Sequence, residues 1–328
     1  MIAYINDPNF PVANGFQFED VSWVKLAPGG DEIYILQRGS PAVSVWDLNG
    51  NHLRDWDTQE LGDPHSLTFQ EFDDGSYSVW ITDMAPPLTA GNVYGHCLKQ
   101  FDMHGNYLGS LGACGENTQG SGLDPLQFDK VTDIAFDSHG YLWVTDGDIG
   151  GLNNRVLQID PATQAVLQAW SAPNNQSGSG PGEFYLPHAI AVDQFERVWI
   201  ADALNQRVQV IKTDGTFLQE LSCFGTDGVY GICVCADLDT GIYQLLVSSS
   251  PTTAPTGGTV QIFEVLPGDL PVPDGCIAEF QWGITLPVGT SEAMLHMLDA
   301  TGPGDQVFLA PLGGDLPPQK WIRVFTPD

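Results

Sequence analysis

The feature that most constrains the fold is a pattern that occurs six times along the chain. In one copy, GEFYLPHAIAVDQFERVWIADALNQRVQV (182–210), an alternating apolar segment precedes a turn, a β-rich run ending in Asp, a short loop and a third strand. The other copies lie at 18–56, 63–111, 128–170, 228–282 and 292–325, the last two being degenerate. Each copy predicts four short strands, and one such sheet cannot bury both of its faces alone.

Six repeats of this kind predict an all-β protein, a six-bladed β-propeller. The last copy ends at its third strand (321–325), so the apolar segment at 2–6 is expected to close the ring as the missing outer strand. We therefore expect one domain over residues 1–328. Its blades are expected at approximately 16–57, 58–112, 124–172, 182–222, 226–284 and 290–328, the last completed by 2–6.

The composition agrees with many short strands and limits the partners. Thirty-seven glycines and 23 prolines supply frequent turns, which favours strands over long helices. The 41 acidic and 11 basic residues give a net charge of −30, and such a surface repels nucleic acid and anionic lipid. No apolar run reaches the ~18 residues that span a bilayer. We expect a monomer that binds neither nucleic acid nor membranes.

The cysteines leave two alternatives open. An even count of six permits up to three disulfides, whereas buried free thiols are the other possibility: Cys97, Cys114, Cys223, Cys233, Cys235 and Cys276. Cys233 and Cys235 are two apart on a strand-like stretch, so they face the same way and are poorly placed to bond each other. No pair has the CxxC spacing of a metal site.

Localisation is indicated only indirectly. The sequon at Asn175 fits an exported protein. The start, MIAYINDPNF, shows no signal peptide, so the chain is either a mature form with an added Met1 or stays inside the cell. Between these two interpretations we favour a secreted, extracellular protein.

Three of the seven histidines occupy one position of the repeat, at the start of its first strand: His65, His188 and His296. They belong to the second, fourth and sixth copies, and the alternate copies hold Ser22, Thr132 and Tyr230 there. First strands line the channel of a propeller, and blades two, four and six are related by about 120°, so the three imidazoles should converge. Three neutral imidazoles with one open position are a ligand set of catalytic zinc.

This alternation is why we predict a shared metal site. A single histidine in a strand is usually structural, but three at one repeat position favour a common ligand. The remaining histidines lie in turns or beside loops and receive no role: His52, His96, His104 and His139.

The residue pattern of the repeat resembles the NHL repeat, especially in VWIADALNQRVQV (198–210). In such repeats Asp and Arg tie strand ends and neighbouring blades through charge-assisted hydrogen bonds. We therefore assign a structural role, not a catalytic one, to five charged residues: Asp83, Asp146, Arg155, Asp202 and Arg207.

Motifs around the whole ring also resemble the peptidyl-α-hydroxyglycine α-amidating lyase family, and more closely the secreted NHL-repeat proteins of animals. They are YILQRGS (34–40), DPHSL (63–67), VTDIAFD (131–137), LPHAIAVD (186–193) and LHMLD (295–299). The resemblance implies a six-bladed NHL propeller that binds zinc through three histidines. It also implies cleavage of a C-terminal α-hydroxyglycine into a peptide amide and glyoxylate.

Carried over residue by residue, the resemblance makes His65, His188 and His296 the zinc ligands. It makes Arg38 an active-site arginine that holds the substrate carboxylate or polarises its hydroxyl.

Three positions depart from the family pattern. Asp148 stands where the lyases have a tyrosine as general base, and Ala203 stands where they have a second arginine. Met297 replaces a calcium-binding aspartate, which makes calcium a weaker expectation than zinc. In place of the lyases' tyrosine, we expect Asp148, or another tyrosine such as Tyr94 or Tyr185, to transfer the substrate proton.

Two hypotheses follow. In the first, the chain is a zinc-dependent carbon–nitrogen lyase whose catalytic residues are Arg38 and Asp148, acting on a small molecule or on the C-terminus of a peptide. In the second, it is a secreted, non-catalytic NHL propeller that binds a ligand or a protein and retains the metal site.

Overall fold

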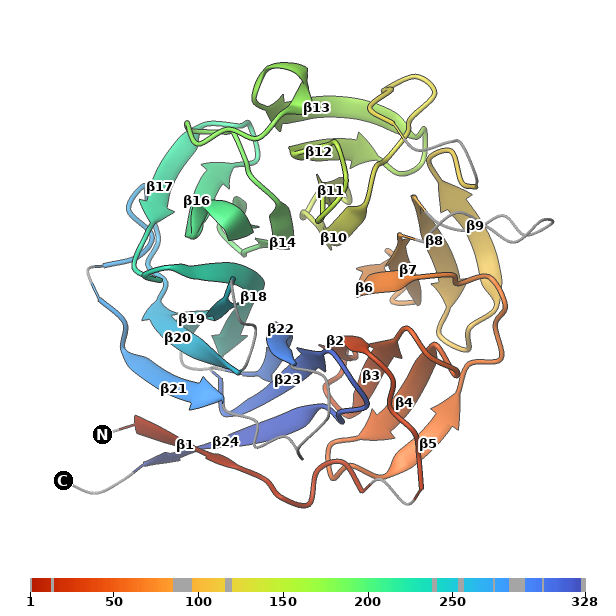
Figure 1. Cartoon of the computed structure of the whole chain (residues 1–328), viewed down its shortest axis with the longest axis vertical. Helices are drawn as coiled ribbons and strands as arrows, with labels where there is room; N and C mark the ends of the chain where they lie inside the picture. Colours follow the sequence, from red (N-terminus) through yellow and green to blue (C-terminus); the bar gives the residue numbers. More distant parts are fainter. Residues whose placement is uncertain are drawn as a thin grey trace. The chain divides into compact units, whose positions relative to one another are not determined.

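The computed structural model describes residues 2–12, 15–84, 96–115, 120–237, 241–252, 257–273, 275–282, 293–302 and 304–325. Within these ranges the strands form six four-stranded antiparallel sheets (Figure 1). The sheets are the six blades of an all-β propeller, as the repeats predict. No helix in the described part of the chain is long and apolar enough to cross a membrane.

The described residues fall into two compact units, and the unit of residues 56–220 holds the second, third and fourth blades. The second blade comprises β6 (Pro64–Glu71), β7 (Tyr77–Asp83), β8 (Cys97–Asp102) and β9 (Tyr107–Leu111). The third comprises β10 (Val131–Phe136), β11 (Leu142–Asp146), β12 (Arg155–Asp160) and β13 (Ala165–Ser171). The fourth comprises β14 (Pro187–Val192), β15 (Arg197–Asp202), β16 (Arg207–Lys212) and β17 (Phe217–Leu221), and two 3-10 turns accompany these strands, η1 (Pro173–Asn175) and η2 (Ala203–Asn205). We call this the central unit.

The other unit, residues 1–55 and 221–328, holds the first, fifth and sixth blades. We call it the terminal unit. The first blade comprises β2 (Val21–Leu26), β3 (Glu32–Gln37), β4 (Val43–Asp47) and β5 (His52–Asp55). The fifth comprises β18 (Asp227–Asp237), β19 (Ile242–Pro251), β20 (Gly258–Glu264) and β21 (Ala278–Trp282). The sixth comprises β22 (Met294–Thr301), β23 (Gln306–Leu312), β24 (Gln319–Phe325) and β1 (Ile2–Asn6). That the chain forms a single domain stays a prediction.

The N-terminal strand completes the sixth blade, as predicted. β1 pairs antiparallel with β24, from Ile2 opposite Phe325 to Asn6 opposite Trp321. The Tyr4 hydroxyl donates a hydrogen bond to the Gly304 carbonyl at 2.8 Å, and its ring stacks on another ring 4.7 Å away, that of Phe280. These contacts join the first residues of the chain to the fifth and sixth blades.

Burial follows the position of each strand in its blade. The second strands of the third and fourth blades, β11 and β15, are buried along their whole length, whereas the outer strand β13 alternates between exposed and half-buried residues. Trp143 of the third blade packs with Phe184 and Val198 of the fourth in one apolar cluster. Burying each such side chain contributes about 1.5–3 kcal/mol, so facing sheets hold each other in place.

Buried charges tie the second strand of each central-unit blade to its third strand. Asp146 accepts a hydrogen bond from Arg155 at 2.8 Å, and the fourth blade repeats this with Asp202 and Arg207, also at 2.8 Å. The other carboxylate oxygen of Asp202 accepts the Tyr185 amide at 2.7 Å. These residues therefore have the structural role that the repeat predicts.

The second blade makes the same tie with different residues. The register places Cys97 opposite Asp83, where the next two blades have arginine. The charge comes instead from Lys99, whose ammonium lies 2.7 Å from the Asp83 carboxylate. Cys97 is bonded to Cys114 in a disulfide with a Cα–Cα distance of 5.2 Å.

The cysteine alternatives thus resolve into a mixture within the described residues: one disulfide and four free thiols. Cys233 and Cys235 are buried and unbonded to each other, as their spacing on β18 predicts. The other two free thiols are the exposed Cys223 and the half-buried Cys276.

Candidate metal centre

The three histidines lie at an irregular point of the first strand of their blades. His65, His188 and His296 are the second or third residues of β6, β14 and β22. In each blade the pairing with the second strand shifts across this residue, as in a β-bulge. The same shift occurs at the equivalent positions in the other blades, Ser22, Thr132 and Tyr230. A bulge takes a residue out of the regular pairing and redirects its side chain, so the repeat position has a defined geometry in all six blades.

Backbone carbonyls fix the orientation of two of the rings. His65 Nδ1 lies 2.8 Å from the carbonyl oxygen of Thr132, and His296 Nδ1 lies 2.9 Å from that of Ser22. A carbonyl can only accept, so in the neutral ring Nδ1 carries the hydrogen and Nε2 the lone pair. A hydrogen bond of this kind is the usual outer support of a metal-bound histidine. The carbonyls come from the equivalent position of the neighbouring blade, so blades without the histidine support those that have it.

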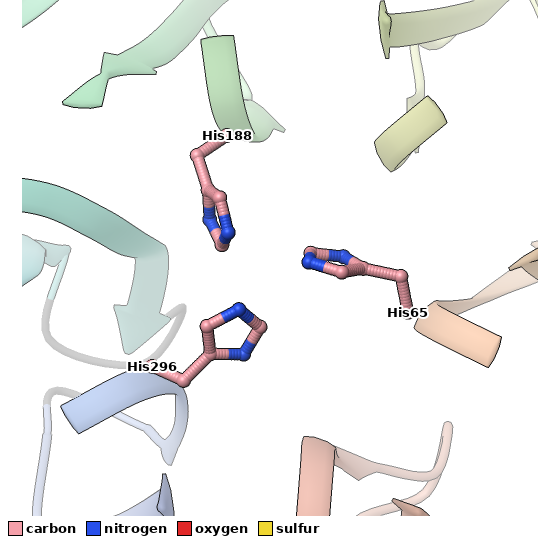
Figure 2. Close-up of side chains that lie close together, drawn as sticks. All are labelled: His65, His188 and His296. Carbon is pink, nitrogen blue, oxygen red and sulfur yellow. The ribbon is translucent and has the colours of Figure 1, made fainter. Parts of the chain in front are cut away.

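The three imidazoles point toward one another (Figure 2). One nitrogen from each ring can be chosen so that all three lie within 4.8 Å of one another, and the residues are at most 2% exposed. The rings of His65 and His188, both in the central unit, have centroids 4.9 Å apart. Tetrahedral zinc with bonds of about 2.0–2.1 Å needs nitrogens roughly 3.3 Å apart, which lies within the 4.8 Å limit that the three ligand atoms satisfy. The three-histidine group could therefore hold a metal ion.

A second group of potential ligands is less suitable. Asp137, His139 and Glu196 also offer atoms within 4.8 Å of one another. However, Asp137 accepts the amides of His139 and Tyr141 with one oxygen, and the Trp143 indole and Gln158 amide with the other. Its carboxylate is thus engaged in shaping the β10–β11 turn, which leaves two ligands where a metal needs at least three.

The structure gives fewer contacts for the residues that are expected to act on the substrate. Arg38 follows β3, and its backbone N–H donates to the Asp20 carbonyl at 3.2 Å. Asp148 lies half-buried in the β11–β12 loop, where its carboxylate accepts the Ile149 amide at 2.7 Å. Tyr185 is 45% exposed just before β14, and Tyr94 lies outside the described residues. The catalytic roles of these residues stay predictions.

The two other departures from the lyase pattern are also buried. Ala203 is fully buried at the start of the 3-10 turn η2, so the second arginine of the lyases is replaced by a packed methyl group. Met297 is fully buried beside His296 and offers no oxygen ligand for calcium.

The fold and this site define a class: a six-bladed β-propeller with a histidine group that could hold a metal ion. No protein-family model matches the chain. It is 36% identical over 200 residues to NHL repeat-containing protein 3 of Mus musculus, covering 60% of this chain and 53% of that protein. It is 33% identical over 153 residues to peptidylglycine alpha-amidating monooxygenase of Rattus norvegicus, covering 46% of this chain and 14% of that one.

These relatives confirm the resemblance seen in the motifs. The chain spans about half the length of NHL repeat-containing protein 3 and a smaller part of the monooxygenase. Among solved structures, virginiamycin B lyase of Staphylococcus aureus aligns with a TM-score of 0.52 at 14% identity, over 99% of both chains. At this identity the structural likeness shows the fold alone.

Proposed function

We propose that the chain is a zinc-dependent lyase of the peptidyl-α-hydroxyglycine amidating type, with zinc held by His65, His188 and His296. The observation that carries the proposal is the buried three-histidine group, with two of its rings oriented by carbonyls so that Nε2 is the ligand atom. The rat relative, whose name specifies the α-amidation of peptidylglycine, supports a peptidyl substrate. Structural zinc sites are usually closed by four protein ligands, whereas three leave a position for substrate.

The reaction removes the proton of the α-hydroxyl, breaks the bond between that carbon and the amide nitrogen, and protonates the nitrogen. The products are a peptide amide and glyoxylate, and no oxidant is required. Zinc, when bound, lowers the pKa of the coordinated hydroxyl. In the proposal Arg38 binds the substrate carboxylate, and Asp148 accepts the hydroxyl proton, with Tyr185 as the alternative base.

The experiment combines metal content with turnover. Protein purified without metal-affinity resin is expected to contain about one zinc per chain and to release glyoxylate from a peptide that ends in α-hydroxyglycine. His188→Ala should lose both zinc and turnover, whereas His139→Ala, at an exposed histidine of the second ligand group, should keep both. A wild-type protein that stays metal-free after incubation with zinc contradicts the site.

A second function is favoured by the changes at Ala203 and Asp148. In this reading the propeller is a secreted binding module that keeps the metal without catalysis. The Cys97–Cys114 disulfide is consistent with an extracellular location, because disulfides persist in oxidising compartments. Zinc-loaded protein that releases no glyoxylate would support this function over the lyase.

A further inference from the structure

One loop of the central unit exposes apolar side chains and is hydrogen-bonded to the segment that leads to His188. In the β11–β12 loop, residues 147–154, Ile149 is 69% exposed and Leu152 is 79% exposed. Leu152 has the highest exposure among the large apolar residues that the structure describes. Tyr185, in the segment that enters β14, is 45% exposed. We call these three residues the apolar rim.

The loop is held in one conformation, so this exposure is not the result of a loose chain. The Leu152 amide donates to the Asp129 carboxylate at 2.9 Å, and the Asn153 side chain donates to Asp146 at 2.9 Å. Gly147 has a φ of 146°, and a Cβ there would lie 2.0 Å from the Asn153 carbonyl oxygen. A Cβ at Gly151 would lie 2.8 Å from the backbone oxygen of Asp129. A rigid loop that presents apolar side chains to water is a typical recognition surface.

A hydrogen bond connects this loop to the strand of His188. The Asn154 side-chain oxygen accepts the Leu186 amide at 2.9 Å, and Leu186 lies two residues before His188. Leu152 lies two residues before Asn154, and His188 lies two residues after Leu186. The lengths of these two segments and of the hydrogen bond therefore limit the distance between the Cα atoms of Leu152 and His188 to at most about 22 Å. An extended peptide spans this distance with roughly six or seven residues. The rim is therefore within reach of a peptide whose C-terminus lies at the histidines.

The size of the rim and the net charge of the chain decide among the rim's possible occupants. A stable protein interface buries on the order of 800 Å² on each partner, which three side chains cannot provide. A net charge of −30 disfavours the approach of anionic membranes. One apolar side chain of a peptide matches the size of the rim and needs no opposite charge.

From these observations we infer that the apolar rim is a specificity subsite that binds an apolar side chain within the last six or so residues of a peptide substrate. This inference rests on the proposed function, because it takes the reacting C-terminus to lie at the three histidines. It adds a preference for apolar residues that the metal centre alone does not impose.

The test uses zinc-loaded protein and two matched sets of six-residue peptides. One set ends in α-hydroxyglycine and is used for turnover, whereas the other carries the product amide and is used for calorimetric binding. Each peptide has Phe at one position and Ser elsewhere, and the reference peptide has Ser throughout. For at least one position, Phe should lower both KM and the dissociation constant of the amide about tenfold relative to Ser.

The double variant Ile149→Ser/Leu152→Ser should bring the Phe-to-Ser ratio close to one. The matched control is Leu270→Ser, which removes a leucine that is 73% exposed in the β20–β21 connection of the terminal unit, and it should keep the wild-type ratio. A double variant that keeps the wild-type preference overturns the inference, as does a wild-type protein with no preference at any position. Loss of self-association or of vesicle binding in the double variant, with peptide binding unchanged, also overturns it.

The binding arm separates this inference from the proposed function. If wild-type protein releases no glyoxylate, the lyase proposal fails. The amide peptides then still show whether the rim prefers Phe over Ser.

Discussion

The two units of the chain differ in the residue that ends the second strand of each blade. In the central unit, a buried aspartate at the end of each second strand accepts the amides of the incoming segment and binds a buried cation, as Asp202 does with Arg207. In the first blade of the terminal unit the equivalent residue is Gln37, which accepts the Glu19 amide at 3.3 Å and donates to the Pro41 carbonyl at 2.9 Å. In the fifth blade the register places the neutral Ser249 at this position, and the hydroxyl of its neighbour Ser250 donates to the Gly257 carbonyl at 2.8 Å.

The difference shows what the fold requires. Buried amides and carbonyls at the strand ends need partners, and either an ion pair or a neutral side chain supplies them. The charged solution leaves a recognisable sequence motif, whereas the neutral one does not. The bulge at the histidine position is present in both units, so His296 keeps its place in a blade whose repeat motif is degenerate.

The comparison predicts unequal costs for removing these ties, and this is the largest effect. Arg207→Ala leaves the Asp202 carboxylate buried without its cation, so it should lower the free energy of unfolding by about 3–5 kcal/mol. Gln37→Ala removes only neutral hydrogen bonds and should cost about 1–2 kcal/mol. Urea unfolding followed by tryptophan fluorescence measures both. Equal losses would mean that the charged and neutral ties are equivalent.

Two glycines with positive φ, one in a loop of each unit, allow the loops of the two units to be compared. Gly147→Ala in the central unit forces a Cβ to 2.0 Å from a carbonyl oxygen, whereas a Cβ at Gly30 in the terminal unit meets nothing within 4 Å. We expect a loss of about 3 kcal/mol for the first and about 1 kcal/mol for Gly30→Ala, from its φ of 73° alone. Thermal unfolding of the two variants measures both losses of stability. A Gly147 variant as stable as the Gly30 variant would show that the rim loop is not rigid.

The smallest effect concerns pH. Burial lowers the pKa of His96 from 6.5, and its Nδ1 accepts the Lys130 amide at 3.3 Å. Below pH 6.5 the unfolded chain therefore binds a proton before the folded chain does, so this contribution to stability is complete above pH 6.5 and lost as the pH falls.

His96→Asn is the variant that isolates this contribution. Asparagine keeps an acceptor, tolerates the φ of 48° and cannot titrate in this range. The fall in Tm between pH 7.5 and pH 5.5 should be smaller in the variant than in wild type. An unchanged fall would assign the pH dependence to other groups.

Much of the fold could be predicted from the sequence because the repeat sets a period. The six blades, the closure of the sixth blade by residues 2–6 and the alternation of His65, His188 and His296 all follow from aligning the copies. Other features depend on contacts between residues far apart in sequence. One is the hydrogen bond between His65 and the carbonyl of Thr132. Another is the second blade, where Cys97 stands in place of the arginine and Lys99 supplies the positive charge to Asp83.

The exposed pair in the β11–β12 loop could not be predicted for a similar reason. DGDIGGLNN (146–154) has the glycines of a tight turn, but a sequence does not tell whether Ile149 and Leu152 point inward or outward. The hydrogen bond from the Leu152 backbone N–H to the carboxylate of Asp129, which lies 23 residues earlier, sets that orientation.

X-ray absorption at the zinc edge of the zinc-loaded protein tests the central claim most directly. Three histidine nitrogens at about 2.0–2.1 Å are predicted, and His65→Ala should lower that number or abolish binding. A shell that contains sulfur, a shell of oxygen ligands alone, or an unchanged spectrum in His65→Ala would contradict the three-histidine centre.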